Sequence, residues 1–520
     1  MKLLPLLLLF FSSAFATGSA ADWPQWRGPL RNGVAPQSVP LLDALPPEGL
    51  PQLWDSESIP SNDDGGLGSP VVADGRVYLS VVWHRDVPTE TRQLDDRVLG
   101  QLGFQPLDAL GTELVQKMER ERESINPQLR GKKLDEHIAQ WTAQHLDKKQ
   151  QQLFGGYVAN RFRKGKLALP LDVLAKLNVQ KKHLFPTATE LEQWLDAQGF
   201  EDWVKREVIA AVPLTRKVAE DTLVCLDLKD GKTHWKTSAP GEPTGPNSSS
   251  TPCVSDGRVF TLGSTHFYCI DAATGETIWS APLPNKGISS SPVVAGTTVV
   301  LNAGKLIAFD ARSGTPLWKQ EKAGGGNSSP VAWSAGDKTL VICNGRSDLA
   351  AVDLATGNLV WSVPGGGDAT PAIAGETLVA QTGKPQLGMV AYRLTPTGAE
   401  KLWNMPMDVL RNQSSAIIHG DSVFLMDDDV HWCFDLATGK VRWQEKVSAT
   451  ISSPVLADGK LFVMTNHGNN LLMLAANGSA RTELGKATVR ATWVPSPAIA
   501  DGRLLVRLKD RLRCYDITRR

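Results

Sequence analysis

FYCIDAATGETIW, residues 267–279, is the stretch that decides the fold of this 520-residue chain. An apolar strand runs into Asp271, the chain turns at Thr274 and Gly275, and a second strand ends at Trp279. Aspartate accepts hydrogen bonds from turn amides, and glycine takes the positive φ that closes such a turn. Tryptophan offers a large flat apolar surface that packs well between neighbouring sheets. We therefore interpret the stretch as a structural hairpin rather than a ligand site.

The same phrase recurs with successive tryptophans 39 to 44 residues apart. A period near 42 residues, with four short strands in each unit, is typical of a β-propeller. The aspartates and tryptophans of the repeat are Asp227, Trp235, Asp271, Trp279, Asp310, Trp318, Asp353, Trp361, Trp403, Asp435 and Trp443.

A second phrase precedes each unit and consists of two apolar strands around a tight turn. Four of these turns are Asp-Gly, a strong hairpin signal, and they begin at Asp74, Asp256, Asp458 and Asp501. The turn glycines count eight units: Gly75, Gly257, Gly296, Gly336, Gly375, Gly420, Gly459 and Gly502. The last unit lacks an outer strand, whereas Trp54 stands alone near the start. We predict an all-β, eight-bladed β-propeller that the N-terminal strand around Trp54 closes beside Cys514.

The first interval between turn glycines is much longer than the rest, and the excess lies in residues 85–217. Apolar residues recur there at helical spacing, so we predict an α-helical insertion in the first blade. We expect helices over 108–124, 132–154 and 200–212, and a capping box at Thr187–Glu190. The basic run at 161–166 is interpreted as a solvated loop, with nucleic-acid binding as the alternative. The propeller then comprises residues 22–84 and 218–520.

Residues 1–21 resemble a cleavable export signal, with Lys2, an apolar run and then small residues. The apolar run is too short to span a bilayer, and no cysteine follows it to carry a lipid. We therefore expect a periplasmic or secreted protein with no integral membrane segment after signal removal. Lys+Arg and Asp+Glu both number 55, so the composition gives no bias toward nucleic acid.

Six cysteines in an exported chain raise the question of disulfides. Four of them occupy equivalent places in different repeats, where the separation is too great for a bridge: Cys225, Cys269, Cys433 and Cys514. We expect all six to be small buried apolar residues. The absence of CxxC spacing excludes the usual haem attachment and zinc motifs.

Strand order places the long polar turns and the blade connections on one face, which we call the loop-rich face. Polar loops on a rigid scaffold are common binding sites. The candidate ligand contacts on this face are His266, Lys305, Arg346, Asp348, Lys384, Arg411, His467 and Lys509. We expect the helical insertion to emerge on the same face and to cap it.

Other polar residues of this face are expected to be structural, and we predict no catalytic residue and no metal ligand. Ser/Thr residues that precede the inner strands fit a crowded axis, with a hydroxyl-lined ligand site as the alternative. Asp427–Asp429 is interpreted as a solvated turn, with cation binding as the alternative. Four histidines are expected at the surface, with metal or acid–base roles as the alternative: His84, His266, His431 and His467.

The repeat AxDxxTGxxxW, as in Asp271–Trp279 and Asp353–Trp361, together with DWPQWRGP at 22–29, resembles the pyrroloquinoline-quinone-like propeller repeat. That superfamily includes quinoprotein alcohol dehydrogenases, which hold the quinone (PQQ) with calcium on the funnel axis, and a propeller lipoprotein of outer-membrane barrel assembly. The dehydrogenases typically carry adjacent cysteines, which this chain lacks.

Two functions follow from the resemblance and the loop-rich face. The first is an exported scaffold without intrinsic catalysis and without a cofactor, binding a protein or polysaccharide partner on that face. The alternative is a PQQ- and calcium-dependent oxidoreductase of alcohols or sugars, and a hydrolase or lyase is a distant third.

Overall fold

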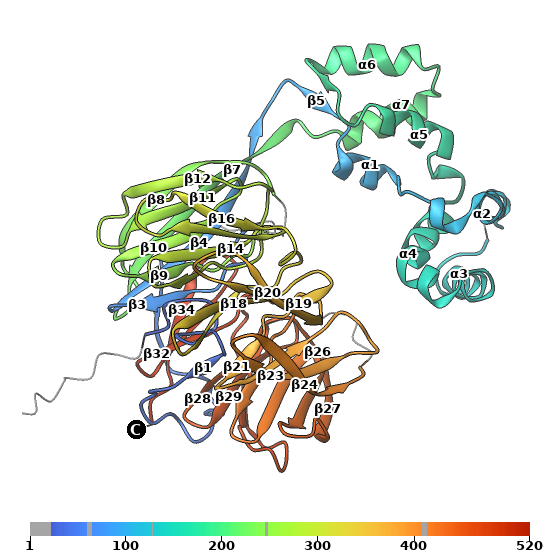
Figure 1. Cartoon of the computed structure of the whole chain (residues 1–520). Coiled ribbons are helices and arrows are strands. Elements are labelled where there is room, and N and C mark those ends of the chain that lie inside the picture. Colours follow the sequence, from blue (N-terminus) through green and yellow to red (C-terminus); the bar gives the residue numbers. More distant parts are fainter. Residues whose placement is uncertain (1–21, 60–64, 127, 245–247, 408–412, 520) are drawn as a thin grey trace, which may run out of the picture. The chain divides into compact units, whose positions relative to one another are not determined.

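The structure is a computed structural model that describes residues 22–59, 65–126, 128–244, 248–407 and 413–519. The chain divides into two units (Figure 1). One contains Met1–Arg85 and Val218–Arg520, and the other contains Asp86–Lys217. The expected export signal lies outside the described residues. Among the residues described, no helix has both the length and the apolar character needed to cross a membrane.

The described strands of the larger unit form eight small sheets, numbered here in chain order. The first sheet contains β3 (Val71–Ala73), β4 (Arg76–Pro88), β7 (Thr215–Asp227) and β8 (Thr233–Gly241), and the second contains β9 (Cys253–Ser255), β10 (Arg258–Leu262), β11 (His266–Asp271) and β12 (Thr277–Pro282). The third sheet contains β13 (Val293–Ala295), β14 (Thr298–Asn302), β15 (Leu306–Asp310) and β16 (Pro316–Gln320). The fourth contains β17 (Val331–Ala335), β18 (Lys338–Asn344), β19 (Asp348–Asp353) and β20 (Leu359–Pro364).

The fifth sheet contains β21 (Ala372–Ala374), β22 (Thr377–Gln381), β23 (Met389–Thr395) and β24 (Gly398–Met405), and the sixth contains β25 (Ile417–His419), β26 (Ser422–Asp435) and β27 (Val441–Thr450). The seventh sheet contains β28 (Val455–Ala457), β29 (Lys460–Thr465), β30 (Asn470–Ala475) and β31 (Glu483–Thr488). The eighth contains β32 (Ala498–Ala500), β33 (Arg503–Arg507) and β34 (Leu512–Asp516). Two N-terminal strands join them: β1 (Val34–Ala35) pairs with β28, and β2 (Gln52–Asp55) pairs with β34.

The pairing of β2 with β34 brings distant parts of the chain together. Trp54 lies opposite Cys514 in an antiparallel register. Beside them, the Nε and Nη2 atoms of Arg513 donate to the two carboxylate oxygens of Asp55 at 2.6 and 2.7 Å. A bidentate pair of this kind fixes geometry as well as adding energy. The eighth sheet therefore takes its fourth strand from the start of the chain.

The tight turns between the first two strands of the sheets have the predicted chemistry. In the first sheet, Asp74 has φ 51° and Gly75 has φ 72°. Two consecutive residues with positive φ match the twist of the flanking strands, and Asp and Gly tolerate this conformation best. Asp256, Asp458 and Asp501 begin turns of the same kind.

The repeated phrase links most of the sheets to the one that follows. Asp271 accepts from the amides of Ala273 and Thr274, which holds the turn. The indole Nε1 of Trp235 reaches this turn from the preceding sheet and donates to the carbonyl of Ala272 at 3.2 Å. Equivalent indole bonds join Trp54 to Leu228, Trp279 to Ala311, Trp318 to Leu354, Trp403 to Leu436 and Trp443 to Asn477.

All six cysteines are buried and none forms a disulfide, as predicted. Burial raises the pKa of Cys253 to about 11, so the thiol is protonated at neutral pH. These residues therefore act as small apolar groups in the core.

The smaller unit is mainly helical, as the composition of the insertion predicts. It contains α1 (Asp96–Leu102), α2 (Thr112–Ser124), α3 (Lys132–His145), α4 (Lys148–Lys164), α5 (Leu171–Val179), α6 (Ala188–Ala197) and α7 (Asp202–Ala211), with short 3₁₀ turns η1 (Asp108–Leu110) and η2 (Gly165–Leu167) and the strands β5 (Arg92–Gln93) and β6 (Leu184–Phe185). Two hydrophobic clusters lie entirely within this unit. Its placement over the loop-rich face stays a prediction.

Two local expectations for the insertion were wrong. The single helix expected over 132–154 is two helices, because Asp147 forms a capping box with Gln150 and starts α4 anew. The basic run at 161–166 is not a solvated loop: Arg161 is buried inside α4 and donates twice to Glu119 at 2.6 Å. A buried arginine needs such a partner, and the partner comes from α2, which local composition does not reveal.

Thr187 caps α6 by accepting from the amide of Glu190.

Candidate functional site

The first strands of the eight sheets are joined by a closed circle of hydrogen bonds, which we call the hydroxyl ring. In each bond a backbone amide donates to a Ser or Thr hydroxyl at the start of the next sheet, at 2.9–3.1 Å. The bonds run from Ser69 to Thr251, then to Ser291, Ser329, Thr370, Ser415, Ser453 and Ser496, and from Ser496 back to Ser69.

The ring explains why short hydroxyl residues precede these strands. Every member is buried, and a buried amide without an acceptor is costly. Serine and threonine place an oxygen within reach of the neighbouring strand and still fit a crowded axis. The residues just before Ser291, Ser329 and Ser415 behave differently. They are Ser290, Ser328 and Ser414, and their hydroxyls are buried without a hydrogen-bond partner.

One side of the ring is filled by the N-terminal segment Asp22–Ala35, which we call the plug. It touches six of the eight sheets through backbone or side-chain hydrogen bonds. These join Trp23 to Val72, Pro24 to Val254, Arg31 to Ser291 and Pro292, Trp26 to Thr370, Arg27 to Ala416 and Gly33 to Leu456. Apart from Ser291 and Thr370, these partners follow the ring residues along the first strands. The plug therefore lies on the side where those strands run toward the tight turns.

On the other side of the ring lies a cavity of about 470 Å³, which we call the axial cavity. It is lined by ring residues, by Trp26 and Trp493, and by the residue two positions before each ring residue. That outer level consists of Leu67, Ser249, Ser289, Asn327, Asp368, Gln413, Ile451 and Val494. Because these residues precede the first strands, the cavity faces the connections between the sheets.

The outer level of the axial cavity is amphipathic. Polar side chains come from five consecutive sheets, the second to the sixth, whereas Leu67, Ile451 and Val494 come from the three that remain. Trp493 adds an aromatic surface next to Val494, and the indole of Trp26 is fixed by a 3.3 Å bond to Thr370. A concave site with an apolar wall and convergent polar groups is suited to holding a ligand or an inserted side chain.

The lining carries few groups for acid–base chemistry. Among the lining residues that the structure describes, Asp368 is the only ionisable side chain, and its Oδ1 accepts from the amide of Asn327 at 2.9 Å.

The same lining can be tested against the quinone and calcium that the resemblance implies. The quinone is a polycarboxylate, and Ca²⁺ takes about six to eight oxygen ligands rich in carboxylates. The part of the lining that the structure describes offers one carboxylate and no Lys, Arg or His. Across the described residues, no group of three His, Cys, Asp or Glu side chains is arranged to hold a metal. The described lining residues therefore do not fit this pair of cofactors.

Seven of the eight candidate contacts are described, and none lines the axial cavity: His266, Lys305, Arg346, Asp348, Lys384, His467 and Lys509. Arg411 lies outside the described residues. The centroid of the His467 ring is 5.7 Å from that of the Trp493 ring, and His467 is exposed. Lys384 donates to the carbonyl of Ser347 at 2.5 Å. Ser347 lies between Arg346 and Asp348 in the sequence. Their ligand-binding role stays a prediction.

Two of the four histidines expected at the surface are buried, so that expectation was wrong for them. His431 is fully buried inside β26, and burial lowers its pKa to about 3. His84 is also buried, and its Nε2 accepts from the amide of Thr244 at 3.2 Å. Both lie in long strands that continue past the point where a turn was expected.

The expectation of a solvated turn at 427–429 was also wrong. This segment lies inside β26, and the Asp427 side chain is buried. Its carboxylate accepts from Gln381 Nε2 at 2.6 Å and from the amide of Ser414 at 3.3 Å. The carboxylate therefore ties the fifth and sixth sheets together rather than facing solvent.

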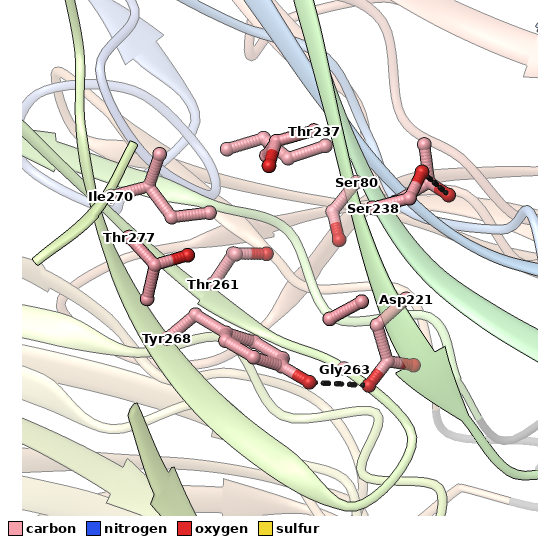
Figure 2. Close-up of a pocket in the computed structure, with 12 residues that line it drawn as sticks. Ser80, Asp221, Thr237, Ser238, Thr261, Gly263, Tyr268, Ile270 and Thr277 are labelled. Carbon is pink, nitrogen blue, oxygen red and sulfur yellow. Dashed lines mark hydrogen bonds between the residues drawn. The ribbon is translucent and has the colours of Figure 1, made fainter. Parts of the chain in front are cut away.

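A second, very small cavity lies between the first and second sheets (Figure 2). Its volume of about 20 Å³ has room for one water molecule. Tyr268 donates to Oδ2 of Asp221 at 3.0 Å, and Oδ1 accepts from the amide of Ser264. Burial raises the pKa of Asp221 above its usual range. This cavity is a structural feature, because it is too small for a substrate.

Sequence reasoning considered the Ser/Thr residues that precede the inner strands, with a hydroxyl-lined ligand site as the alternative, but it missed the outer level of the axial cavity. The candidates were chosen as charged residues in long turns, whereas the lining is mostly neutral and comes from the connections. Alternate residues of an extended strand share a face. The residue two positions before each ring residue could therefore have been predicted to line the same cavity. Trp26 was quoted in the sequence but could not be placed, because its contact with Thr370 spans 344 positions.

Comparisons with known proteins agree with the repeat. The PQQ_2 family model, described as Outer membrane protein assembly factor BamB, matches residues 219–445 and 302–517. Tetrathionate hydrolase of Acidithiobacillus ferrooxidans is 26% identical over 219 residues, which cover 40% of this chain and 40% of that protein. BamB of Burkholderia pseudomallei is 24% identical over 311 residues, covering 55% of this chain and 76% of that protein.

BamB of Salmonella typhimurium is 25% identical over 264 residues, which cover 47% of this chain and 64% of that protein. The chain thus spans less than two thirds of two of these three relatives. Among solved structures, BamB from Moraxella catarrhalis has a TM-score of 0.45 and 17% identity, with 57% of this chain and 89% of that chain covered. A europium-containing methanol dehydrogenase has a TM-score of 0.42 and 12% identity, with 56% and 80% covered.

Proposed function

Because the chain belongs to the PQQ-like repeat family described as Outer membrane protein assembly factor BamB, we propose that it is a non-catalytic scaffold that binds a protein partner. The partner binds the face where the sheets are connected, around the mouth of the axial cavity. The protein works outside the cytoplasm, in the periplasm or after secretion. The named BamB relatives are assembly factors, and a binding role of that kind needs no cofactor.

The proposal includes an eight-bladed propeller that β2 closes. The hydroxyl ring supports it, because eight amides and eight hydroxyls return to their starting point. The pairing of Trp54 with Cys514 supports it too, as does the indole bond from Trp54 to Leu228 of the first sheet. A ring without open sheet edges is a rigid platform for binding.

The observation that carries the binding function is the axial cavity. It has a plug on one side and faces the sheet connections on the other, with an apolar wall opposite a polar one. Exposed apolar groups rimmed by polar residues commonly mark interaction sites. The poor fit to quinone and calcium makes the oxidoreductase the weaker candidate, and a polysaccharide partner remains an outcome of the test.

The test compares the two faces by mutation. Arg346 is exposed at a long turn on the proposed face, and Arg312 is exposed in a tight turn of the neighbouring sheet. We expect Arg346→Glu to weaken capture of the protein partner from an envelope extract at least tenfold and Arg312→Glu to leave it unchanged. Equal effects of the two substitutions would remove the assignment of the face.

A second experiment addresses catalysis. The purified protein is mixed with pyrroloquinoline quinone and calcium, and absorbance and dye-linked oxidation of alcohols and sugars are measured. We expect neither stoichiometric quinone binding nor turnover. Stoichiometric binding with turnover would replace the scaffold by the oxidoreductase, and retention on a polysaccharide matrix without a protein partner would change the partner class.

A further inference from the structure

The plug carries two arginines whose positive charges are placed inside the larger unit. Arg27 and Arg31 are each only 2% exposed. A buried charge is stable only when paired or fully hydrogen-bonded, because desolvation of an ion is expensive. Among the described residues, neither guanidinium makes a salt bridge or hydrogen bond to a carboxylate. Their partners are neutral.

The neutral partners leave part of each guanidinium unused. Nη2 of Arg27 donates to the carbonyls of Asn32 and Ala416, but its Nε and Nη1 are buried without an acceptor. Arg31 donates through Nη1 and Nη2 to Gln25, Ser291 and Pro292, and its Nε has no acceptor. Three nitrogens of one short segment therefore lack a partner, although every nitrogen of a guanidinium is a hydrogen-bond donor.

Among the described residues, neither the nearby thiols nor the ring hydroxyls supply the missing acceptors. The thiols of Cys253 and Cys343 lie close to Arg31, and burial raises the pKa of both, so they are neutral. The oxygens of the hydroxyl ring already accept backbone amides, so their own protons are additional donors. The two guanidiniums also repel each other, since Arg31 contributes to a lowered pKa of Arg27. The axis thus combines excess positive charge with excess donors.

We propose that the plug binds a small monovalent anion, a halide such as chloride, between Arg27 and Arg31. The anion accepts from the unused guanidinium nitrogens and offsets one of the two buried charges. By holding both arginines, it locks the plug against the third and sixth sheets, to which they are bonded. The proposal is independent of the partner on the opposite face.

Location is tested with crystals of the full chain grown or soaked in bromide. We expect an anomalous peak within hydrogen-bonding distance of Arg27 Nε or Nη1 and of Arg31 Nε. Occupancy of the position by water, without an anomalous peak, overturns the proposal.

Energetics are tested by urea unfolding while chloride replaces gluconate at constant ionic strength. Above the dissociation constant, a tenfold rise in chloride should lower the unfolding equilibrium constant tenfold in the wild type. Arg27→Met and Arg31→Met should remove this dependence. Arg507→Met is the matched control, because Arg507 is equally buried but lies in the eighth sheet, and it should keep the dependence.

The wild-type measurement decides the question even where a variant fails to fold. A flat chloride response in the wild type overturns the proposal. A response to formate without a response to chloride would also overturn it, because the site would then recognise a carboxylate rather than a halide.

Discussion

The amide of Ser496 donates to the hydroxyl of Ser69 at 2.9 Å across 427 positions of sequence. Seven further bonds of the same kind complete the hydroxyl ring, so each first strand is tied to the next by one short side chain. Every residue of the ring is buried, and a buried amide that loses its acceptor is costly. Its contribution to stability can be measured one hydroxyl at a time.

Ser453→Ala should destabilise the protein by about 1–3 kcal/mol, because the buried amide of Ser415 loses its acceptor. Ser414→Ala is the control, since the Ser414 hydroxyl is equally buried but has no partner. We expect this control to be neutral within about 0.5 kcal/mol. Urea unfolding of the two variants gives the difference, and equal losses would show that the ring bond contributes nothing.

Gly275→Ala should cost about 2–4 kcal/mol, because a new Cβ would stand 2.7 Å from the ring of Trp235 at a residue with φ 79°. Gly257→Ala separates the two causes. Its φ is 68°, but no atom lies within 4 Å of the added carbon, so only the backbone term of about 1 kcal/mol remains. Thermal unfolding of both variants tests this order, and a reversed order would contradict the packing described for the repeat.

Trp403→Phe should cost about 1 kcal/mol more than Trp361→Phe. Both indoles are 7% exposed, but Trp403 donates to Leu436 at 2.8 Å whereas Nε1 of Trp361 has no partner. The fifth sheet, which follows Trp361, carries a looser copy of the repeat. Paired unfolding curves measure the difference, which should vanish if the indole bonds are unimportant.

Asp221 should make stability fall as the pH rises above about 4. Burial raises its folded pKa, so the folded state holds this proton more tightly than the unfolded chain does. The resulting stability is full below the unfolded pKa and is lost as the pH passes through the folded pKa. Asp221→Asn should make the urea midpoint change less with pH between pH 4 and 7 than it does in the wild type. Asp348→Asn, at an exposed position, should leave the pH dependence of the midpoint as in the wild type.

The six buried thiols should be unreactive in the native protein. A thiol reagent such as a disulfide dye should titrate none of them before unfolding and all six in denaturant. The melting temperature should be the same with and without reductant. A drop in melting temperature on reduction would reveal a disulfide and contradict the structure.

Local rules succeeded where the signal is contained in a few neighbouring residues. The Asp-Gly turn at Asp74 needs two residues with positive φ, and few residue pairs other than Asp-Gly or Asn-Gly provide them. Trp54 could be assigned opposite Cys514 because the last repeat unit lacks an outer strand, whereas the strand around Trp54 near the start of the chain has no hairpin before it.

Reasoning from composition failed where a distant partner decides burial. Arg161 looked solvated because its neighbours are basic, but Glu119 from α2 neutralises it. Asp427 looked like part of an acidic turn, but Gln381 of the fifth sheet satisfies its carboxylate. The axial cavity was missed for the same reason, since Trp26 reaches it only through contacts that span most of the chain.

The ion pair between Asp55 and Arg513 joins positions 458 residues apart. It can therefore form only after the residues between them have been synthesised. At about 5–20 residues per second, β2 waits on the order of tens of seconds after its synthesis before its partner strand exists. A strand with an unpaired edge is prone to aggregate during that interval. Until β34 (Leu512–Asp516) has been synthesised, β2 has no partner strand, so a premature stop before β34 would leave β2 unpaired.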